Sequence, residues 1–237
     1  KETIKECIMN RRIFIKKTIF PAMMAGLGGA NIPNLISEHS KDDKRIRLSE
    51  NGPMIPPVPA ILLTVNGRLG DPKEISVVWT FVLEGKPPQI GISVADYHIA
   101  GDLIKMHEEF VLNVPTADMV TAFDTVDMNS SKVGDKYALS KLTEGKAVVV
   151  DAPTISEAPI QVECRIFNTI AVPPHRTVFF ADVVATTVLE GVCDKSGRLI
   201  VPNVSFFGMT AGSGEFYTMG KPVGHIGKTV GRNDIKY

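Results

Sequence analysis

The stretch "EISVVWTFVLEGKPPQIGISV", residues 74–94, holds two runs of branched and aromatic residues on either side of a short segment with one glycine and two prolines. Runs of this length and composition, separated by a hairpin-length gap, are typical of paired β-strands. Similar runs recur along the chain. We therefore predict strands over residues 58–66, 74–82, 88–94, 110–115, 159–172 and 177–189.

Two segments between these runs have a different spacing. Apolar residues recur near helical spacing over residues 98–109, and residues 116–126 are also predicted to be helical, with Thr116 as a candidate N-cap. A parallel sheet would need a regular helix in each crossover, which this chain lacks. The sequence predicts a mainly β protein: an antiparallel, Greek-key-like barrel with short covering helices.

Composition divides the chain into three parts. Lysine and arginine balance aspartate and glutamate at 26 each, but residues 1–30 hold six basic and two acidic residues, which leaves 20 against 24 in the remainder. Residues 31–57 are polar and then proline-rich, as in a flexible tether. Residues 58–237 form the predicted domain. It has no basic stripe with interleaved aromatic residues, so we expect no nucleic-acid partner.

The N-terminal part resembles an export signal. In "NRRIFIKKTIF", residues 10–20, Arg11 and Arg12 precede an apolar stretch that ends in small residues and is shorter than the roughly 20 residues of a membrane span. This order is similar to a twin-arginine signal. It predicts an exported, periplasmic protein without a stable membrane span after signal removal. The alternative is an ordinary basic amphipathic helix.

Motifs that carry chemistry are missing from the predicted domain. It has no nucleophile elbow, zinc-protease or phosphate-loop motif, and the five histidines show no metal-ligand spacing, so no metal site is expected. Cys164 and Cys193 lack the spacing of a redox or zinc pair, and we expect two free thiols. In "QVECRIF", alternation of Val162, Cys164 and Ile166 with polar residues predicts a strand with one buried face.

Seven segments in register carry a resemblance: "PVPAILLTVN", "EISVVWTFVLEGKPPQIGISV", "LIKMHEEFVLNVP", "GDKY", "APIQVECRI" and "FFADVV", with the two strands of the second counted separately. Together they are similar to the flavin reductase-like family, including its flavoredoxin-type members. The resemblance covers roughly residues 57–220. It implies a split β-barrel, FMN as cofactor and a homodimer. The tail "VSFFGMTAGSGEFYTMG", residues 204–220, is expected to reach a neighbouring subunit.

The resemblance also implies a site. Backbone N–H and C=O groups of "VVWT" would meet the polar rim of the flavin ring, and the turn and helix start in "ISVADYHIA" would meet the phosphate. His175 is placed near the open face of the flavin, where it would orient an electron donor. The implied cofactor-binding residues are Val77, Val78, Trp79, Thr80, Ser93, Val94, Tyr97, His98, Ile99, Ala100 and Lys136.

Several of these residues have a structural alternative. Trp79 could fill the core, His98 could be a solvated residue at a helix start, Lys136 a surface lysine, and His175 a polar residue that enters a strand. Asn113 is expected to satisfy backbone groups rather than to touch a cofactor.

The chain departs from the family where the phosphate would bind. The family often has arginine, followed two residues later by threonine, whereas this chain has His98 and Ala100. The phosphate would therefore be bound more weakly. Its binding would also depend more on pH if His98 titrates near neutrality.

These features predict an FMN-binding oxidoreductase that acts outside the cytoplasm. It would be either an NAD(P)H-dependent enzyme or an electron carrier for a redox protein partner. Export favours the carrier, because nicotinamide dinucleotides are scarce outside the cytoplasm. The alternative is a flavin-free barrel that binds another small molecule or acts in assembly.

Overall fold

The computed structural model describes residues 46–132, 134–211 and 213–231. The predicted signal segment, residues 1–30, and the first part of the predicted tether lie outside these residues. Residues 46–57 are exposed and form neither helix nor strand. Contacts group the chain from Asn51 onward into one compact unit.

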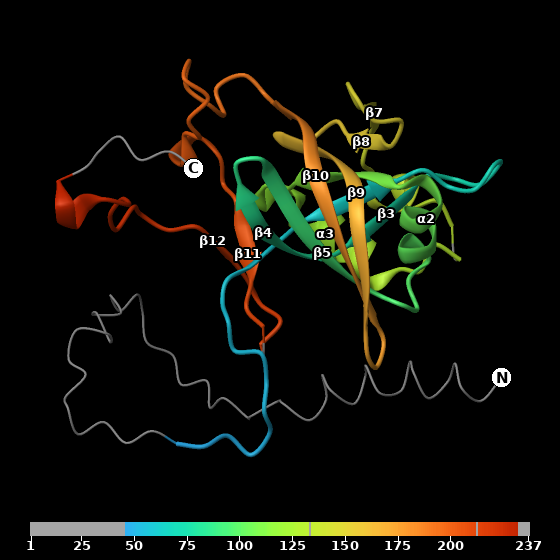
Figure 1. Ribbon diagram of the computed structural model, residues 1–237, viewed down its shortest axis with the longest axis horizontal. Helices are drawn as coiled ribbons and strands as arrows, with labels where there is room; N and C mark the ends of the chain where they lie inside the picture. Colours follow the sequence, from blue (N-terminus) through green and yellow to red (C-terminus); the bar gives the residue numbers. More distant parts are fainter. Residues whose placement is uncertain (1–45, 133, 212, 232–237) are drawn as a thin grey trace, which may run out of the picture. The chain divides into compact units, whose positions relative to one another are not determined.

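Seven strands of the described residues form one antiparallel sheet (Figure 1), in the order β3-β2-β6-β9-β10-β5-β4. β3 runs into β4 through the single residue Val78, so the two ends of the sheet are one continuous segment and the sheet closes into a barrel. The predicted antiparallel barrel is confirmed. The strands are β2 (Leu62–Val65), β3 (Glu74–Val77), β4 (Trp79–Gly85), β5 (Pro88–Ala95), β6 (Glu109–Val114), β9 (Ile160–Val172) and β10 (Arg176–Val188).

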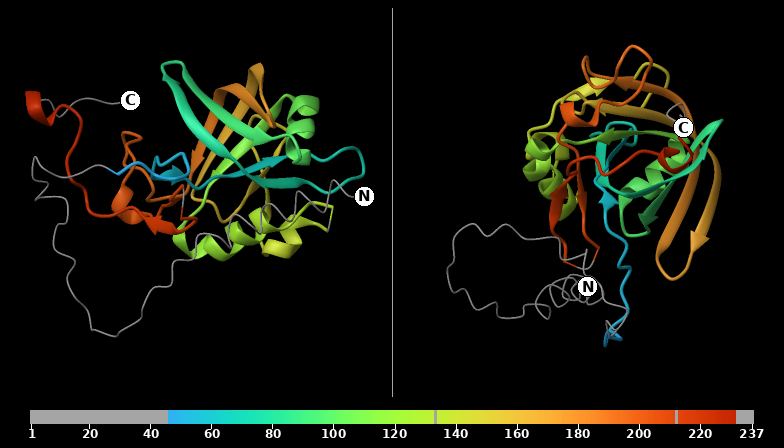
Figure 2. Two further views of the ribbon diagram at one scale, coloured as in Figure 1. Left: turned by 90° about the horizontal axis from the view of Figure 1, so that it is seen from below. Right: turned by 90° about the vertical axis from the view of Figure 1, so that its left-hand side faces the viewer.

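Helix α2 (Ile99–His107) connects β5 to β6 and buries Ala100, Leu103 and Ile104 in the main core. The 3₁₀ turn η1 (Ala117–Met119), helix α3 (Val120–Met128) and helix α4 (Lys136–Ser140) pack elsewhere on the barrel, on a different side from α2 (Figure 2). Both predicted helices are therefore present. Thr116 is the N-cap residue of η1, as predicted, but its hydroxyl donates to the Asp118 carboxylate and makes no capping bond to a backbone N–H.

A second apolar core lies between the barrel and α3. Strands β11 (Phe207–Met209) and β12 (Phe216–Thr218) form a small sheet with β1 (Val58–Pro59). The ring of Phe123 on α3 meets those of Phe207 and Phe216 edge-on, at centroid distances of 5.4 and 5.6 Å. This part of the tail that was expected to reach a neighbouring subunit packs against its own chain.

The outward face of β9 is also covered. β7 (Glu144–Lys146) and β8 (Pro153–Ile155) pair with each other, and the loop between them crosses Glu163. Glu163 is fully buried and accepts the backbone N–H groups of three successive loop residues, at 2.7–3.0 Å. The prediction that only one face of this strand is buried is therefore wrong at Glu163, where backbone donors replace the lost water.

Asn113 is the polar residue at the centre of the barrel wall. Its amide donates to the carbonyl of Leu62 at 3.1 Å and the hydroxyl of Thr64 at 3.0 Å, and its oxygen accepts the N–H of Ile155 at 2.8 Å. The side chain thus ties β6 to β2 and β8, which confirms the expectation that it satisfies backbone groups.

Candidate functional site

The candidate site begins where one strand exchanges partners. Val77 pairs with Leu62 on β2, and two residues later Trp79 pairs with Ser93 on β5. β3 and β4 end the strand order, so no strand of the described residues pairs with their outer edges. Around Val78, backbone N–H and C=O groups therefore lie outside the ladder and can meet a ligand.

The side chains of Val78, Trp79 and Thr80 lie in different environments. Val78 is buried in the barrel core, so only its backbone can contact a ligand. The Thr80 hydroxyl donates to the carbonyl of Gly91 at 3.1 Å. Trp79 is 43% exposed, which makes the core-filling alternative for this residue wrong.

Arg176 lies over Trp79, and the sequence analysis missed it. Its guanidinium carbon is 4.6 Å from the centre of the Trp79 ring. Its Nε donates to the Ser93 hydroxyl oxygen at 2.7 Å, and its Nη2 donates to the Ser93 carbonyl at 2.8 Å. Burial lowers the pKa of Arg176, while Tyr97 and Asp96 oppose that shift, and arginine remains charged at neutral pH. An arginine at the start of a strand gives no local signal of this contact.

The segment from Ser93 to Ala100 forms the second part of the site. Val94 and Ala100 are buried in the main core, so these two side chains cannot reach a ligand and only their backbone can. His98 is the N-cap of α2, with extended backbone and no side-chain capping bond. Tyr97 is exposed, with its ring centroid 4.5 Å from that of His98.

The turn between β9 and β10 is fixed against this segment. The N–H of Asp96 donates to the carbonyl of His175 at 3.0 Å, and the Thr177 hydroxyl donates to the Asp96 carboxylate at 2.9 Å. His175 is exposed and does not belong to a strand, because β10 begins at Arg176. The structure thus brings His175 next to the turn that precedes His98, while its role stays a prediction.

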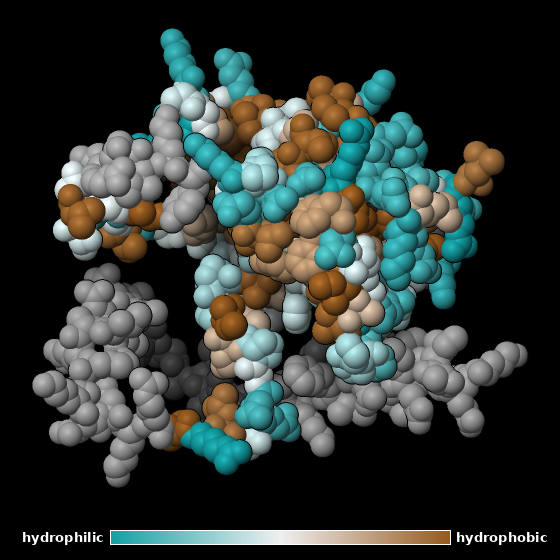
Figure 3. Space-filling view, viewed as in Figure 1, coloured by the Kyte–Doolittle hydropathy of each residue, from teal (hydrophilic) through white to brown (hydrophobic). Residues whose placement is uncertain are grey.

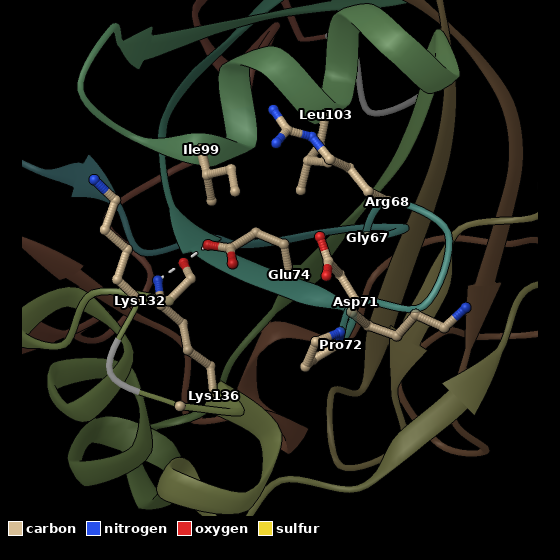
Figure 4. Close-up of a pocket in the computed structure, with 12 residues that line it drawn as sticks. Gly67, Arg68, Asp71, Pro72, Glu74, Ile99, Leu103, Lys132 and Lys136 are labelled. Carbon is tan, nitrogen blue, oxygen red and sulfur yellow. Dashed lines mark hydrogen bonds and ion pairs between the residues drawn. The ribbon is translucent and has the colours of Figure 1, made fainter.

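A pocket of about 240 Å³ lies beside the start of α2 (Figure 4). Ile99 and Lys136, both predicted to bind cofactor, line it. Lys136 is 4% exposed, and its Nζ donates to the Glu74 carboxylate at 3.1 Å and the Ile75 carbonyl at 2.8 Å, so the surface-lysine alternative is wrong. The charged residues of the lining leave an excess of two positive charges; they are Arg68, Lys73, Lys132 and Lys136 against Asp71 and Glu74.

Five of the predicted site residues fall into two groups by the position of their side chains. Trp79, Ser93 and Tyr97 lie at or near the Arg176 guanidinium, whereas Ile99 and Lys136 line the pocket. Within the described chain, no cluster of three or more histidine, cysteine or acidic side chains is placed to hold a metal ion. Cys164 and Cys193 are both free, as predicted.

Comparison with known proteins identifies the fold family. The model of the flavin reductase-like domain matches residues 56–201, more than half of the chain. The chain belongs to the flavin reductase-like family. An uncharacterised protein of Pyrococcus abyssi is 29% identical over 144 residues, which are 61% of this chain and 80% of that protein.

Solved structures show the same fold. Flavoredoxin of Desulfovibrio vulgaris (Miyazaki F) superposes with a TM-score of 0.71 at 22% identity, over 77% of this chain and 97% of that chain. Flavoredoxin from Methanosarcina acetivorans gives 0.71 at 23% identity, over 79% and 100%. The predicted split β-barrel of the flavin reductase-like family is confirmed. In the part of the chain that the structure describes, no helix is long and apolar enough to cross a membrane.

Proposed function

We propose that this flavin reductase-like protein binds one FMN per subunit and acts in electron transfer. The observation that carries the proposal is the open backbone edge at Val77–Thr80, beside an exposed tryptophan and a helix start. A flavin ring presents donors and acceptors along one rim, and a fixed row of backbone groups can match them.

The residues present fit this cofactor. Val77–Thr80 would hold the ring through backbone groups, and Ser93 with the first N–H groups of α2 would receive the phosphate. The positive excess in the neighbouring pocket supports an anionic group there. When bound, FMN supplies the redox chemistry, and the protein supplies orientation and exclusion of water.

Two features would make binding of the FMN phosphate weaker than in proteins with the family pattern. His98 offers no guanidinium fork. The charge of Lys136 is already paired with Glu74, so it is less available to a phosphate. Ala100 contributes little to this difference, because its side chain belongs to the core.

The test begins with the colour of the purified protein. We expect a yellow protein whose released flavin has the mass of FMN, at one per subunit. A colourless protein that takes up neither FMN nor riboflavin would contradict the proposal and favour the flavin-free alternative. Anaerobic mixing with NADH then separates the two redox functions. We expect slow or absent bleaching, because export favours an electron carrier with a protein partner over an NAD(P)H-dependent enzyme.

We further propose a homodimer, supported by exposed aromatic rings on the outer face of the barrel. The aromatic patch consists of Phe81, Phe167 and Phe180; Phe180 lies 6.4 Å from Phe81 and 6.3 Å from Phe167 between ring centroids. Gly91 is required beneath it, because a Cβ there would come within 2.1 Å of the Phe81 ring. Figure 3 shows apolar side chains gathered over the centre of this face, where β9 and β10 lie.

An exposed patch of this kind commonly marks an interface. Phe167 and Phe81 are each nearly half exposed, and the hairpin between β9 and β10 adds exposed Ile170 and Val172. We expect light scattering to give a dimer, and Phe81→Ser with Phe167→Ser to give a monomer. A wild-type protein that is monomeric in solution would contradict the proposed homodimer.

Export through the twin-arginine route completes the proposal. That route carries folded proteins, and a non-covalent flavin must be enclosed before transport if the protein is to keep it. The support is the sequence of residues 10–30 alone.

A further inference from the structure

Arg176 connects the two parts of the proposed flavin site. Its Nε donates to the hydroxyl oxygen of Ser93 at 2.7 Å, and its Nη2 donates to the Ser93 carbonyl at 2.8 Å. Its guanidinium carbon lies 4.6 Å from the centre of the Trp79 ring. Ser93 belongs to the part proposed to receive the phosphate, and Trp79 to the segment proposed to hold the ring. One side chain of β10 therefore contacts both parts.

The position of Arg176 is fixed by contacts at both ends of the side chain. Arg176 is the first residue of β10, and Ser93 is its diagonal neighbour on the same face of β5. Beside it, the Thr177 hydroxyl donates to the Asp96 carboxylate at 2.9 Å, and the N–H of Asp96 donates to the carbonyl of His175 at 3.0 Å. All these contacts lie within one chain, so a second copy that covered this face would not remove them.

The hydrogen bond from Arg176 sets the direction of the Ser93 hydroxyl. A serine hydroxyl has one proton to donate and two lone pairs that accept. Because arginine has no acceptor, the Oγ of Ser93 can only accept from Nε, and its own proton must point to a different group. The hydroxyl is thus presented as a donor. The neighbouring charge polarises it, which strengthens a hydrogen bond to an anion.

The phosphate turn has reason to depend on this arginine. Residue 98 is histidine where the family often has arginine, and the charge of Lys136 is paired with Glu74. Arg176 brings a guanidinium to the same turn from a different strand. Its planar fork, held by two hydrogen bonds, has little rotamer freedom left to lose when a ligand binds.

We propose that Arg176 is a positioning residue that makes the site selective for a phosphorylated flavin. It acts through Ser93, whose hydroxyl it holds as a donor to the phosphate. This inference rests on the proposed function and deepens it, because it names the contact that selects FMN over riboflavin.

Titration of the purified protein with FMN and with riboflavin, after removal of bound flavin, tests this role. The two ligands share the ring and the ribityl chain and differ in the phosphate, so the ratio of their dissociation constants measures the preference for phosphate. We expect the wild type to prefer FMN. Arg176→Gln should lower that preference at least about tenfold, the scale of one charge-assisted hydrogen bond. A merely structural role would weaken both flavins together and leave the ratio unchanged.

A double-mutant cycle shows whether Arg176 acts through Ser93. Ser93→Ala should cause a similar loss of preference, and the double variant should lose clearly less than the product of the two single losses. Arg176→Lys keeps the charge without the planar fork, so it should retain only part of the preference. Arg165→Gln, at an exposed arginine on β9 that pairs with Glu109 at 3.5 Å, is the matched control and should keep the wild-type ratio. Circular dichroism verifies that each variant is folded.

The outcomes separate this role from the proposed function. An unchanged ratio in Arg176→Gln, independent losses in the double-mutant cycle, or the full wild-type ratio in Arg176→Lys would overturn the positioning role, while flavin binding by the wild type would uphold the proposed function. A wild type that binds neither FMN nor riboflavin would overturn the proposed function and this inference with it.

Discussion

The coupling free energy between Glu74 and Lys136, which form a buried ion pair, should be far larger than that between the partners of an exposed pair in the same protein. Both side chains are 5% exposed, with Nζ 3.1 Å from Oε1. Glu74 also accepts the Ser76 hydroxyl at 2.8 Å, and Lys136 donates to the carbonyl of Ile75 at 2.8 Å. Lys136→Met would leave a buried carboxylate with one neutral donor, and Glu74→Gln would leave a buried ammonium beside neutral oxygens.

Removal of one partner from a buried pair costs about 3–5 kcal/mol, because the other charge stays buried without compensation. The neutral hydrogen bonds that remain place each single variant near the lower end, at about 3 kcal/mol. In a domain of this size that lowers Tm by about 6–12 °C. Since the double variant has no charge left to compensate, it should cost at least about 2 kcal/mol less than the sum of the singles.

Urea unfolding, followed by Trp79 fluorescence and by circular dichroism, gives the four free energies of unfolding in this cycle. The matched control is the pair of Arg165 and Glu109, whose side chains are 54% and 15% exposed. The coupling free energy of this control pair, measured with Arg165→Met, Glu109→Gln and the double variant, should stay below about 1 kcal/mol. A coupling between Glu74 and Lys136 no larger than this control would refute the reasoning.

Three further outcomes are expected. His98→Arg should tighten FMN binding about tenfold, or about 1–2 kcal/mol, because guanidinium donates two parallel bonds to a phosphate; unchanged affinity in a flavin titration would mean that residue 98 does not face the phosphate. In a Cys7→Ser background, Ellman's reagent should modify Cys193 and spare Cys164 until unfolding. Cys164 is fully buried and burial raises the pKa of its thiol, so thiolate is scarce at neutral pH, and rapid modification of both would contradict this. Lysine at residues 11–12 should leave folded, yellow protein in the cytoplasm, because Lys keeps the charge without the planar fork; export of this variant with its FMN would rule out the twin-arginine signal.

Local sequence was sufficient to predict where the larger strands and helices lie. Runs of branched residues between turn-forming residues mark strands through short-range chemistry alone, and each of the six predicted runs contains a strand. The breaks within 58–66 and 74–82 were not predictable, because they arise where the chain changes its pairing partner. β11 and β12 have three residues each and were missed. β11 pairs with β1 from the opposite end of the domain, so local sequence does not encode that pairing.

The candidate site, too, could be predicted from the sequence only in part. The sequence, through its resemblance to a family, indicated the segments around Trp79 and Ala100, but not which side chain would face solvent and which the core. Only the tertiary structure paired Lys136 with Glu74, 62 residues earlier, and brought Arg176 onto β5, 83 residues away from its partner. Burial and ion pairing depend on which distant strands meet. A periodic pattern along one strand indicates which of its faces is buried, but not which other strand lies beside it.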